Sequence, residues 1–526
     1  MRTTAFCLAL AGVVISVAEA GLETRLDQGV IVGSAQSNIG KMPQGAIALS
    51  EPDSPFVAFN IWVKAGSQND PKGKEGLAAL TANLLAEGST RQNDYEQILA
   101  RLYPMAAEYH YSVDKEMTDF TGRVHRDNLA SYYALFKNVV LSPDFREEDF
   151  TRIKTRTLNY LKQARRFSND EELSKELLYR EIFRGTPYEH PEEGYVTSVE
   201  TIGLDDVTAF YAKYYTRENV VAGVAGSYPV NFVNRMRGDL DALPAGKVAP
   251  VPKPTPATID GVRILIVEKN TTATPISFGF PISLLRSDPD FYAMMLANSW
   301  LGEHRTAVSH LYQVIRATRG LNYGDYTYIE AYPRGFATQV PPTNVSRRSQ
   351  MFEGWIRPVS MTAPGTLHDR SLFAFRAALR EIARLVQTGM TREAFEAQRR
   401  YLRNYHVNFG VTVGRRLAYR IDDVFYGIRE SGFLASIGPE LDALTVEKVN
   451  AAIKKHLQAR NMWAVFITQD AEGMKKKLIE GAETQISYAG RQPKEVLDED
   501  RIIASYPIPV AAKDITTVNI NEVFER

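Results

Sequence analysis

The chain has 526 residues, of which 44% are hydrophobic and 24% are charged. Its 62 Lys and Arg residues balance 62 Asp and Glu residues, and it holds a single cysteine. This apolar content is enough for large cores and excludes disorder as the main state. At about 150 residues per domain, the length predicts roughly three domains, or fewer and larger ones. A net charge of zero, with no long basic stretch, does not predict the positively charged surface that a nucleic-acid-binding protein would need.

The N-terminus is typical of a secretory signal peptide. Met1-Arg2 supplies a short positive start, Ala5 to Val17 is almost wholly apolar, and Ala18-Glu19-Ala20 is a small-x-small cleavage site. The apolar run is too short to span a bilayer, so a membrane anchor is the weaker interpretation. Cys7 precedes the predicted cut, so the mature chain would contain no cysteine and form no disulfide. We therefore expect an exported protein.

A proline-rich segment divides the remaining chain. Residues 243–258 read LPAGKVAPVPKPTPAT, which disfavours helix and suits an extended linker. The sequences on its two sides resemble each other. Val207 to Asn219 leads into the apolar run Val220 to Gly226, and Val449 to Asn461 leads into Met462 to Ile467. This offset of 242 residues indicates two copies of one domain rather than a solenoid of short repeats.

Each half mixes strands with long helices. Alternating side chains over Val57 to Val63 predict a strand, and Ile276 to Ile282 occupies the corresponding place in the second half. Apolar residues at helical spacing predict helices over residues 76–86, 373–385 and 391–404. The predicted fold class is therefore α+β, in two homologous domains that each combine a mainly antiparallel sheet with long helices.

Five segments follow from these patterns. The predicted boundaries are 1–20 for the signal peptide, 21–242 for the N-terminal domain, 243–258 for the linker, 259–480 for the C-terminal domain and 481–526 for a tail. Because the tail is polar and rich in proline, we expect it to be extended and to lie over a domain surface.

The common catalytic motifs are missing. The chain has no phosphate-binding GxxxxGK[ST], no nucleophile-elbow GxSxG and no HExxH. None of its eight histidines lies three or four residues from another, so no helix presents two imidazoles on one face. His304 and His310 are six residues apart and fall on different faces. A self-contained zinc site is therefore disfavoured.

Residues 65–89 nevertheless carry a family resemblance. They read AGSQNDPKGKEGLAALTANLLAEGS and follow the alternating strand. This order resembles the start of the pitrilysin/insulinase family of zinc peptidases, which includes the mitochondrial processing peptidase. In that family the helix carries HxxEH, whose imidazoles hold zinc while the Glu acts as general base on the metal-bound water. The corresponding positions here are Ala79, Ala82 and Asn83, none of which suits that chemistry.

The family's third zinc ligand is also replaced. A Glu on a neighbouring helix corresponds to Tyr160, 77 residues after Asn83, and a phenol with a pKa of about 10 is an unsuitable ligand. Weaker matches in the same order, LSPDF at 141–145 and GTPY at 185–188, support the alignment. With all four positions altered, the resemblance implies a processing-peptidase-like chain that lacks the zinc motif and uses the first helix for core packing.

The second half departs less from the family. Residues 309–323, SHLYQVIRATRGLNY, resemble a signature in which an Arg on a helix and a Tyr seven residues later reach across the central cavity to the zinc site. Here these are Arg316 and Tyr323. Both side chains donate hydrogen bonds and suit a scissile carbonyl and its developing oxyanion. The alternative is a solvated arginine and a tyrosine packed beside Tyr326 and Tyr328. The resemblance covers about residues 46–474.

The family resemblance implies a particular assembly. In its bacterial and mitochondrial branches, a peptidase can be built from one chain that carries zinc and one that lacks it. This chain would be the non-zinc-binding subunit of such a metalloendopeptidase, in the bacterial periplasm, forming a clam-shell half with a zinc-bearing paralogue as partner. Arg316 and Tyr323 would act in trans, on extended peptides that pair with an edge strand. The chain itself would hold no cofactor and cleave no peptide alone.

Two other functions remain open at the level of sequence. One is a catalytically dead scaffold or peptide-binding protein of the same fold, in which Arg316 and Tyr323 have no catalytic role. The other is a self-sufficient metallopeptidase whose zinc ligands include residues such as His110 and His125.

Overall fold

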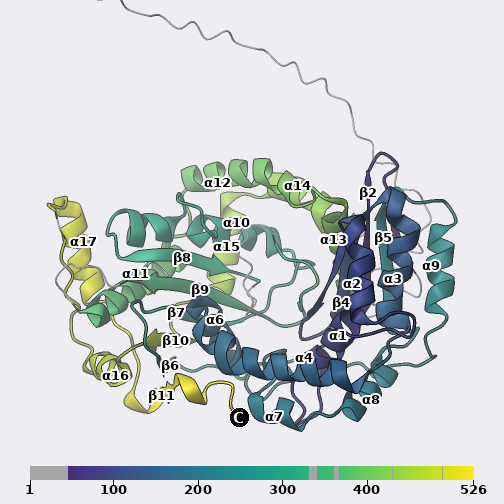
Figure 1. Cartoon of the computed structure of the whole chain (residues 1–526). Helices are drawn as coiled ribbons and strands as arrows, with labels where there is room; N and C mark the ends of the chain where they lie inside the picture. Colours follow the sequence, from purple (N-terminus) through teal and green to yellow (C-terminus); the bar gives the residue numbers. More distant parts are fainter. Residues whose placement is uncertain (1–45, 331–340, 360–365, 429–430, 489) are drawn as a thin grey trace, which may run out of the picture.

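Two β-sheets, one in each half of the molecule, organise the fold (Figure 1). The structure is a computed structural model that describes residues 46–330, 341–359, 366–428, 431–488 and 490–526. The predicted signal peptide, residues 1–20, lies outside these residues. The first sheet has the order β1-β5-β2-β4-β3, formed by β1 (Ala46–Ser50), β2 (Phe56–Val63), β3 (Glu108–Val113), β4 (Thr118–His125) and β5 (Val220–Gly226).

The second sheet repeats this arrangement and adds one strand. Its order is β11-β6-β10-β7-β9-β8, formed by β6 (Val262–Glu268), β7 (Ile276–Ile282), β8 (Asn322–Tyr328), β9 (Gln350–Pro358), β10 (Met462–Thr468) and β11 (Ile515–Asn519). In both sheets a parallel pair, β1–β5 or β6–β10, continues into antiparallel strands, and in the second sheet β11 adds a further parallel pair with β6. β10 begins at Met462, 242 residues after the start of β5 at Val220. The predicted α+β class and the duplication are confirmed.

Helices of the first half cover one face of the first sheet. Phe59 on β2 stacks on Tyr133 of α3 and contacts Phe232 of α9, with ring centroids 5.6 and 6.0 Å apart. The helices of this half are α1 (Leu77–Glu87), α2 (Tyr95–Leu102), α3 (Leu129–Leu141), α4 (Glu147–Asn159), α5 (Arg165–Phe167), α6 (Asp170–Ile182), α7 (Val196–Thr201), α8 (Leu204–Tyr214) and α9 (Phe232–Leu240).

The second half is richer in long helices. α10 packs beside β8 and α11 packs against β9. The helices of this half are α10 (Phe291–Gly302), α11 (Leu367–Thr388), α12 (Arg392–Tyr405), α13 (Val413–Tyr426), α14 (Phe433–Ala443), α15 (Val446–His456), α16 (Ala471–Glu480) and α17 (Lys494–Ala504). Among the described residues, no helix has both the length and the apolar content needed to cross a membrane.

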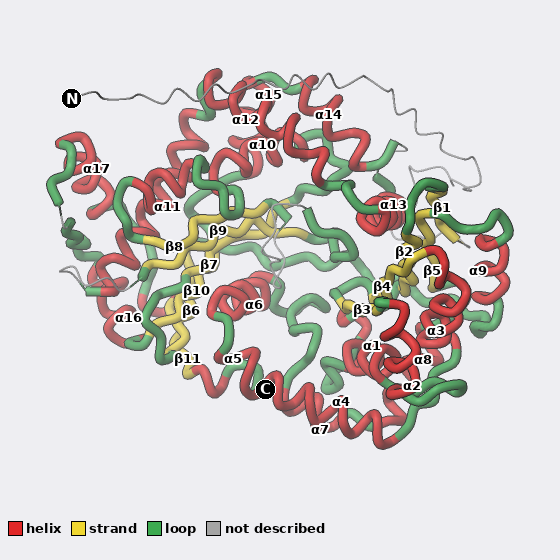
Figure 2. Tube along the Cα trace, turned by 45° about the horizontal axis from the view of Figure 1, so that its top comes forward, coloured by secondary structure: helices red, strands yellow, loops and turns green. Residues whose placement is uncertain are grey.

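Each half lends one helix to the sheet of the other half. α6 packs on β7 and β10, whereas α13 packs on β2 and β5, and we call these two the exchanged helices. Figure 2 shows both of them between the two sheets. Trp62 on β2 is fully buried, and its ring centroid lies 4.3 Å from that of Phe425 on α13. At Gly223 on β5, an added Cβ would lie 2.9 Å from the ends of the Leu417 and Ile421 side chains, so a larger residue there would force these side chains of α13 to shift.

The C-terminal segment differs from the extended tail that the sequence predicts. Residues 481–526 include α17, and they include β11, which pairs with β6 in parallel. Beyond β11 the chain returns to the first half, where the backbone N–H of Val196 donates to the carbonyl of Phe524 at 2.9 Å. Arg166 pairs with Glu525 at 2.6 Å. The end of the chain therefore joins the second sheet to the first half.

Replacing Phe425 with alanine should destabilise the whole molecule. Loss of a buried phenylalanine costs about 3–5 kcal/mol through lost burial and the cavity that remains. We therefore expect Phe425→Ala to lower the thermal midpoint measured by calorimetry. Val407→Ala is the control, since Val407 is 65% exposed and surface changes usually stay within about 0.5 kcal/mol. Equal midpoints for the two variants would contradict a shared core.

Candidate functional site

The first part of the candidate site is the start of α1. The buried carboxylate of Asp70 accepts hydrogen bonds from the backbone N–H groups of Gly76 and Ala78, both at 2.7 Å. Burial raises the pKa of Asp70 well above its ordinary value. Because these N–H groups have no partner within the helix, the carboxylate fixes where α1 begins. α1 then packs against β3 and α4.

A guanidinium bridges the two helices that would hold the family's metal ion. Nη2 of Arg156, on α4, donates to Oδ1 of Asn83 at 2.8 Å, and Nη1 pairs with Oε2 of Glu87 at 2.5 Å. The hydrogen bond to Glu87 raises the pKa of Arg156. Arg156 lies one helical turn before Tyr160, which opens the π-helical turn Tyr160–Ala164 and is 38% exposed.

The side chains at this place do not fit zinc. Ala82 is fully buried and Ala79 partly buried, and neither has a donor atom. Asn83 already accepts from Arg156, whose positive charge opposes a second cation. Across the ranges that the structure describes, no three or more His, Cys, Asp or Glu side chains are grouped so that they could hold a metal ion.

The structure does not bring His110 and His125 together. His110 on β3 lies opposite Thr121, whereas His125 lies four residues farther along β4, opposite Phe56. Four residues of strand correspond to ~13 Å. Each imidazole has its own acidic neighbour, Glu108 at 3.1 Å from His110 and Asp127 at 3.3 Å from His125. This geometry gives no support to a metal site built on the two histidines.

The second part of the candidate site surrounds Arg316. Arg316 lies in the π-helical turn Tyr312–Ala317, and its guanidinium carbon lies 4.9 Å from the ring centroid of Tyr312. Gly320 has φ of 64°, a left-handed conformation that lets the chain turn into β8. Buried Arg319 pairs with Glu499 and Asp500 of α17, at 2.8 Å each. The C-terminal segment thus fixes the turn that carries Arg316.

Asp325 is the buried carboxyl beside this turn. Burial raises its pKa to about 7, although a hydrogen bond from Asn322 and the charge of Arg316 act in the opposite direction.

Tyr323 lies on β8, but its side chain is outside the described part of the structure, so its pairing with Arg316 stays a prediction. Figure 1 shows α1 and α4 in one half and β8 in the other. Arg316 and the zinc-motif positions therefore belong to separate halves of the chain.

Polar contacts also join the two halves. The segment 344–348 of the second half reaches the turn between β3 and β4 and the first residues of β4. There, Nδ2 of Asn344 donates to Asp119 at 3.1 Å, and the backbone N–H of Glu116 donates to Ser346 at 2.9 Å. Arg348 pairs with the buried carboxylate of Glu116. We call these contacts the polar seam.

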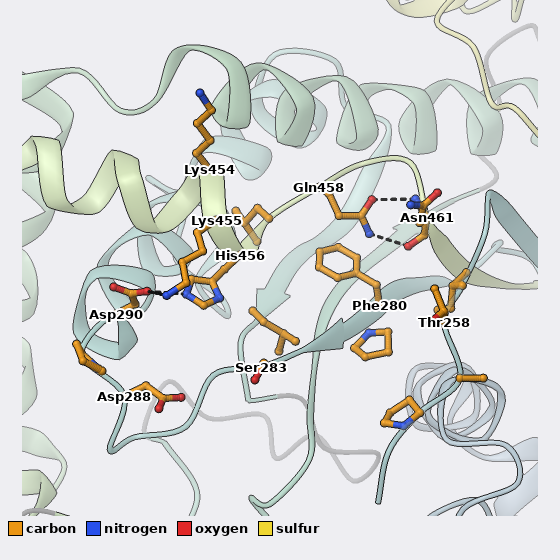
Figure 3. Close-up of a pocket in the computed structure, with 17 residues that line it drawn as sticks. Thr258, Phe280, Ser283, Asp288, Asp290, Lys454, Lys455, His456, Gln458 and Asn461 are labelled. Carbon is orange, nitrogen blue, oxygen red and sulfur yellow. Dashed lines mark hydrogen bonds and ion pairs between the residues drawn. The ribbon is translucent and has the colours of Figure 1, made fainter.

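A cavity of about 860 Å³ lies elsewhere, in the second half (Figure 3). Its wall includes Lys455 and His456, at the end of α15, which both contact Oδ2 of Asp290, at 2.6 and 2.8 Å. These hydrogen bonds lower the pKa of Asp290. Gln458 donates to the carbonyl of Asn461 at 2.6 Å. Because these groups bond to one another and the wall contains no predicted site residue, the cavity is separate from the candidate site.

Sequence reasoning missed Arg156 and Glu87. Helical spacing places each on the face of a predicted motif position, because Glu87 follows Asn83 by four residues and Arg156 precedes Tyr160 by four, but spacing alone does not bring the two together. Residues at this spacing share one helix face. The missing information was that α1 and α4 face each other.

The chain belongs to peptidase family M16. Residues 46–194 match the family model described as "Insulinase (Peptidase family M16)", and residues 201–402 match the one described as "Peptidase M16 inactive domain". Together the two matches cover about two thirds of the chain.

Similar proteins include one with a non-peptidase name. The "Non-peptidase homolog YmxG" of Helicobacter pylori is 21% identical over 79% of this chain and 89% of its own length. An "Uncharacterized zinc protease" of Rickettsia bellii is 25% identical over 56% of this chain and 70% of its own length. The chain is therefore similar both to a protein named as a peptidase and to one named as a non-peptidase.

Solved structures share the fold. The crystal structure of a peptidase M16 inactive domain from Pseudomonas fluorescens has a TM-score of 0.69 at 23% identity, and covers 81% of this chain and 96% of that one. A protease from Helicobacter pylori also has a TM-score of 0.69, at 14% identity, and covers 81% of this chain and 98% of that one. These likenesses confirm the fold of two M16-like domains.

Asp325→Asn should make stability less dependent on pH. Since the pKa of Asp325 is about 7 in the folded chain and its ordinary value is 3.8, the unfolded chain loses this proton first as pH rises. The wild-type protein therefore loses stability between about pH 4 and about pH 7, and the asparagine variant lacks this loss. Thermal melting should show the midpoint of the variant rising relative to that of the wild type across this window. A difference that is constant with pH would contradict the buried, protonated carboxyl.

Proposed function

We propose that this chain is the non-zinc-binding subunit of a two-chain zinc metalloendopeptidase. The observation that carries the proposal is an asymmetry. The four zinc-motif positions, Ala79, Ala82, Asn83 and Tyr160, have no ligand chemistry, whereas the second half keeps Arg316 and the turn that leads to Tyr323. The match to the M16 inactive-domain model and the name of the Helicobacter pylori relative support a chain that does not cleave peptides alone.

The partner is a paralogue with an intact HxxEH motif, and zinc is bound in that partner. This chain completes the substrate chamber and supplies Arg316 and Tyr323 to the partner's metal centre. Both side chains donate hydrogen bonds to the scissile carbonyl and stabilise the oxyanion that develops on it. The apolar segment at residues 5–17 supports export, and we place the assembly in the bacterial periplasm.

Substrates are peptides or unfolded segments in extended form. β3 is one of the two edge strands of the first sheet, and among the described residues it pairs with β4 alone. A peptide that adds to its other side gains backbone hydrogen bonds at every second residue, which gives affinity with little dependence on sequence.

Arg316→Met should lower the activity of the two-chain complex without preventing its assembly. Removal of one oxyanion donor typically costs about 10²–10³ in kcat. Because the interaction is made in the transition state, kcat and kcat/KM should fall together while KM changes little. Tyr323→Phe should act in the same direction. The measurement is hydrolysis of a fluorogenic peptide by the reconstituted pair.

Arg392→Met is the matched control, since this arginine on α12 has a side chain that is 76% exposed. It should leave the kinetic constants unchanged. If the double variant Arg316→Met and Tyr323→Phe were as active as the control, the catalytic role would be lost and a catalytically dead scaffold of the same fold would be the better account.

A further inference from the structure

The guanidinium of Arg156 carries a further inference, which deepens the proposed function and rests on it. It links Asn83 and Glu87 on α1 to α4, at the place where the family binds its metal ion. We propose that Arg156 is a resident cation that replaces zinc in the first half. It excludes a metal ion from this half, and it donates hydrogen bonds to a backbone carbonyl of the peptide that pairs with β3.

The exclusion of metal follows from charge and from ligand use. Arg156 is permanently protonated, and its pKa is raised further by the hydrogen bond to Glu87. The nearest acidic group, Glu87, and the oxygen of Asn83 are both engaged by this guanidinium. A divalent cation at the same place would meet a positive charge and no carboxylate of its own. The site therefore has a cation without the water-activating chemistry of a metal.

The choice of ligand follows from the charge balance around Arg156. The neighbouring Arg152 pairs with Asp149 at 2.8 Å, and Arg156 pairs with Glu87, so the two arginines are matched by two carboxylates. A carboxylate ligand would be repelled by Glu87, whereas a neutral carbonyl oxygen would not. The side chain of Arg156 is 49% exposed, and a guanidinium has five N–H donors. A neutral peptide carbonyl is the ligand that fits this site best.

The position of Arg156 also suits a peptide on β3. α1 packs directly against β3, and α4 packs against α1. Tyr111 on β3 and Tyr95 on α2 lie close enough to Arg156 to interact electrostatically with its guanidinium and to contribute to its raised pKa. A peptide added to the open edge of β3 would therefore run beside the guanidinium, where its carbonyl oxygens can accept hydrogen bonds.

Metal binding by the full chain without its partner tests the exclusion. One variant restores the four family positions with Ala79→His, Ala82→Glu, Asn83→His and Tyr160→Glu, and a second variant adds Arg156→Met. Equilibrium dialysis against zinc, with the bound metal measured by atomic absorption, should show affinity at least about tenfold higher in the second variant, because a repelling charge has been removed. Equal zinc affinity in the two variants would overturn the proposal.

Peptide binding in the wild-type background tests the second role and does not depend on how the restored variants fold. The probe is fluorescein-labelled casein, an unfolded polypeptide, measured by fluorescence anisotropy. Arg156→Met should weaken binding about tenfold or more, as expected for loss of a charged hydrogen bond. Arg152→Met, on the same helix, is the matched control and should bind as the wild type does. Unchanged affinity of Arg156→Met would overturn the carbonyl role. Neither measurement involves the partner. Failure of the two-chain function would instead be seen in the hydrolysis experiment with the reconstituted pair.

Discussion

The packing of the two exchanged helices is the constraint on which the rest of the structure depends. α13 covers β2 and β5 through Phe425 against Trp62, and α6 covers β7 and β10. A sheet must bury its apolar face against another layer, and here each half supplies part of that layer for the other. Neither half can therefore complete its core alone. The relative position of the halves follows from core packing.

The polar seam adds specificity to this packing. Lys115 and Glu192, both in the first half, form a buried pair at 2.6 Å, and Arg348 from the second half pairs with Glu116. Buried ion pairs give little net stability, but an unpaired member is strongly destabilising. Of these two pairs, the one between Arg348 and Glu116 joins the two halves, so separation of the halves would leave Glu116 without this partner. The candidate site is divided between the two halves: Arg156 lies in the first half, and the turn that carries Arg316 lies in the second.

Local patterns in the sequence were sufficient for much of the fold. The strand predicted over 276–282 matches β7, and that over 57–63 matches β2 to within one residue, because the residue pattern that indicates a strand is a local property of the sequence. Both faces of these strands are buried almost throughout, so the alternation in residue type does not become an alternation in burial. The helix predicted over 373–385 extends to Leu367–Thr388. Its first turn is polar and is set by the hydroxyl of Thr366, which accepts from the N–H of Asp369. Such a cap is not visible in apolar spacing.

Features that depend on contacts distant in the sequence could not be predicted. Nothing in the sequence of α6 or α13 indicates that each belongs to the other half's sheet. The same holds for β11, which joins β6 across more than two hundred residues, and for α17, whose Glu499 and Asp500 hold Arg319. Arg156 was missed for this reason too, since its role depends on α4 facing α1. By contrast, the sequence alone shows that the four zinc-motif positions lack metal ligands, because this depends only on residue type at Ala79, Ala82, Asn83 and Tyr160.

The central claim is that this chain contributes to proteolysis only together with a zinc-bearing partner. The most direct measurement is hydrolysis of a quenched fluorescent peptide by this chain alone, by the paralogue with an intact HxxEH alone, and by their mixture, with zinc content determined for each. The account predicts that this chain holds no stoichiometric zinc and that activity rises strongly on mixing. Activity and bound zinc in the isolated chain, or no effect of mixing on the partner, would contradict it.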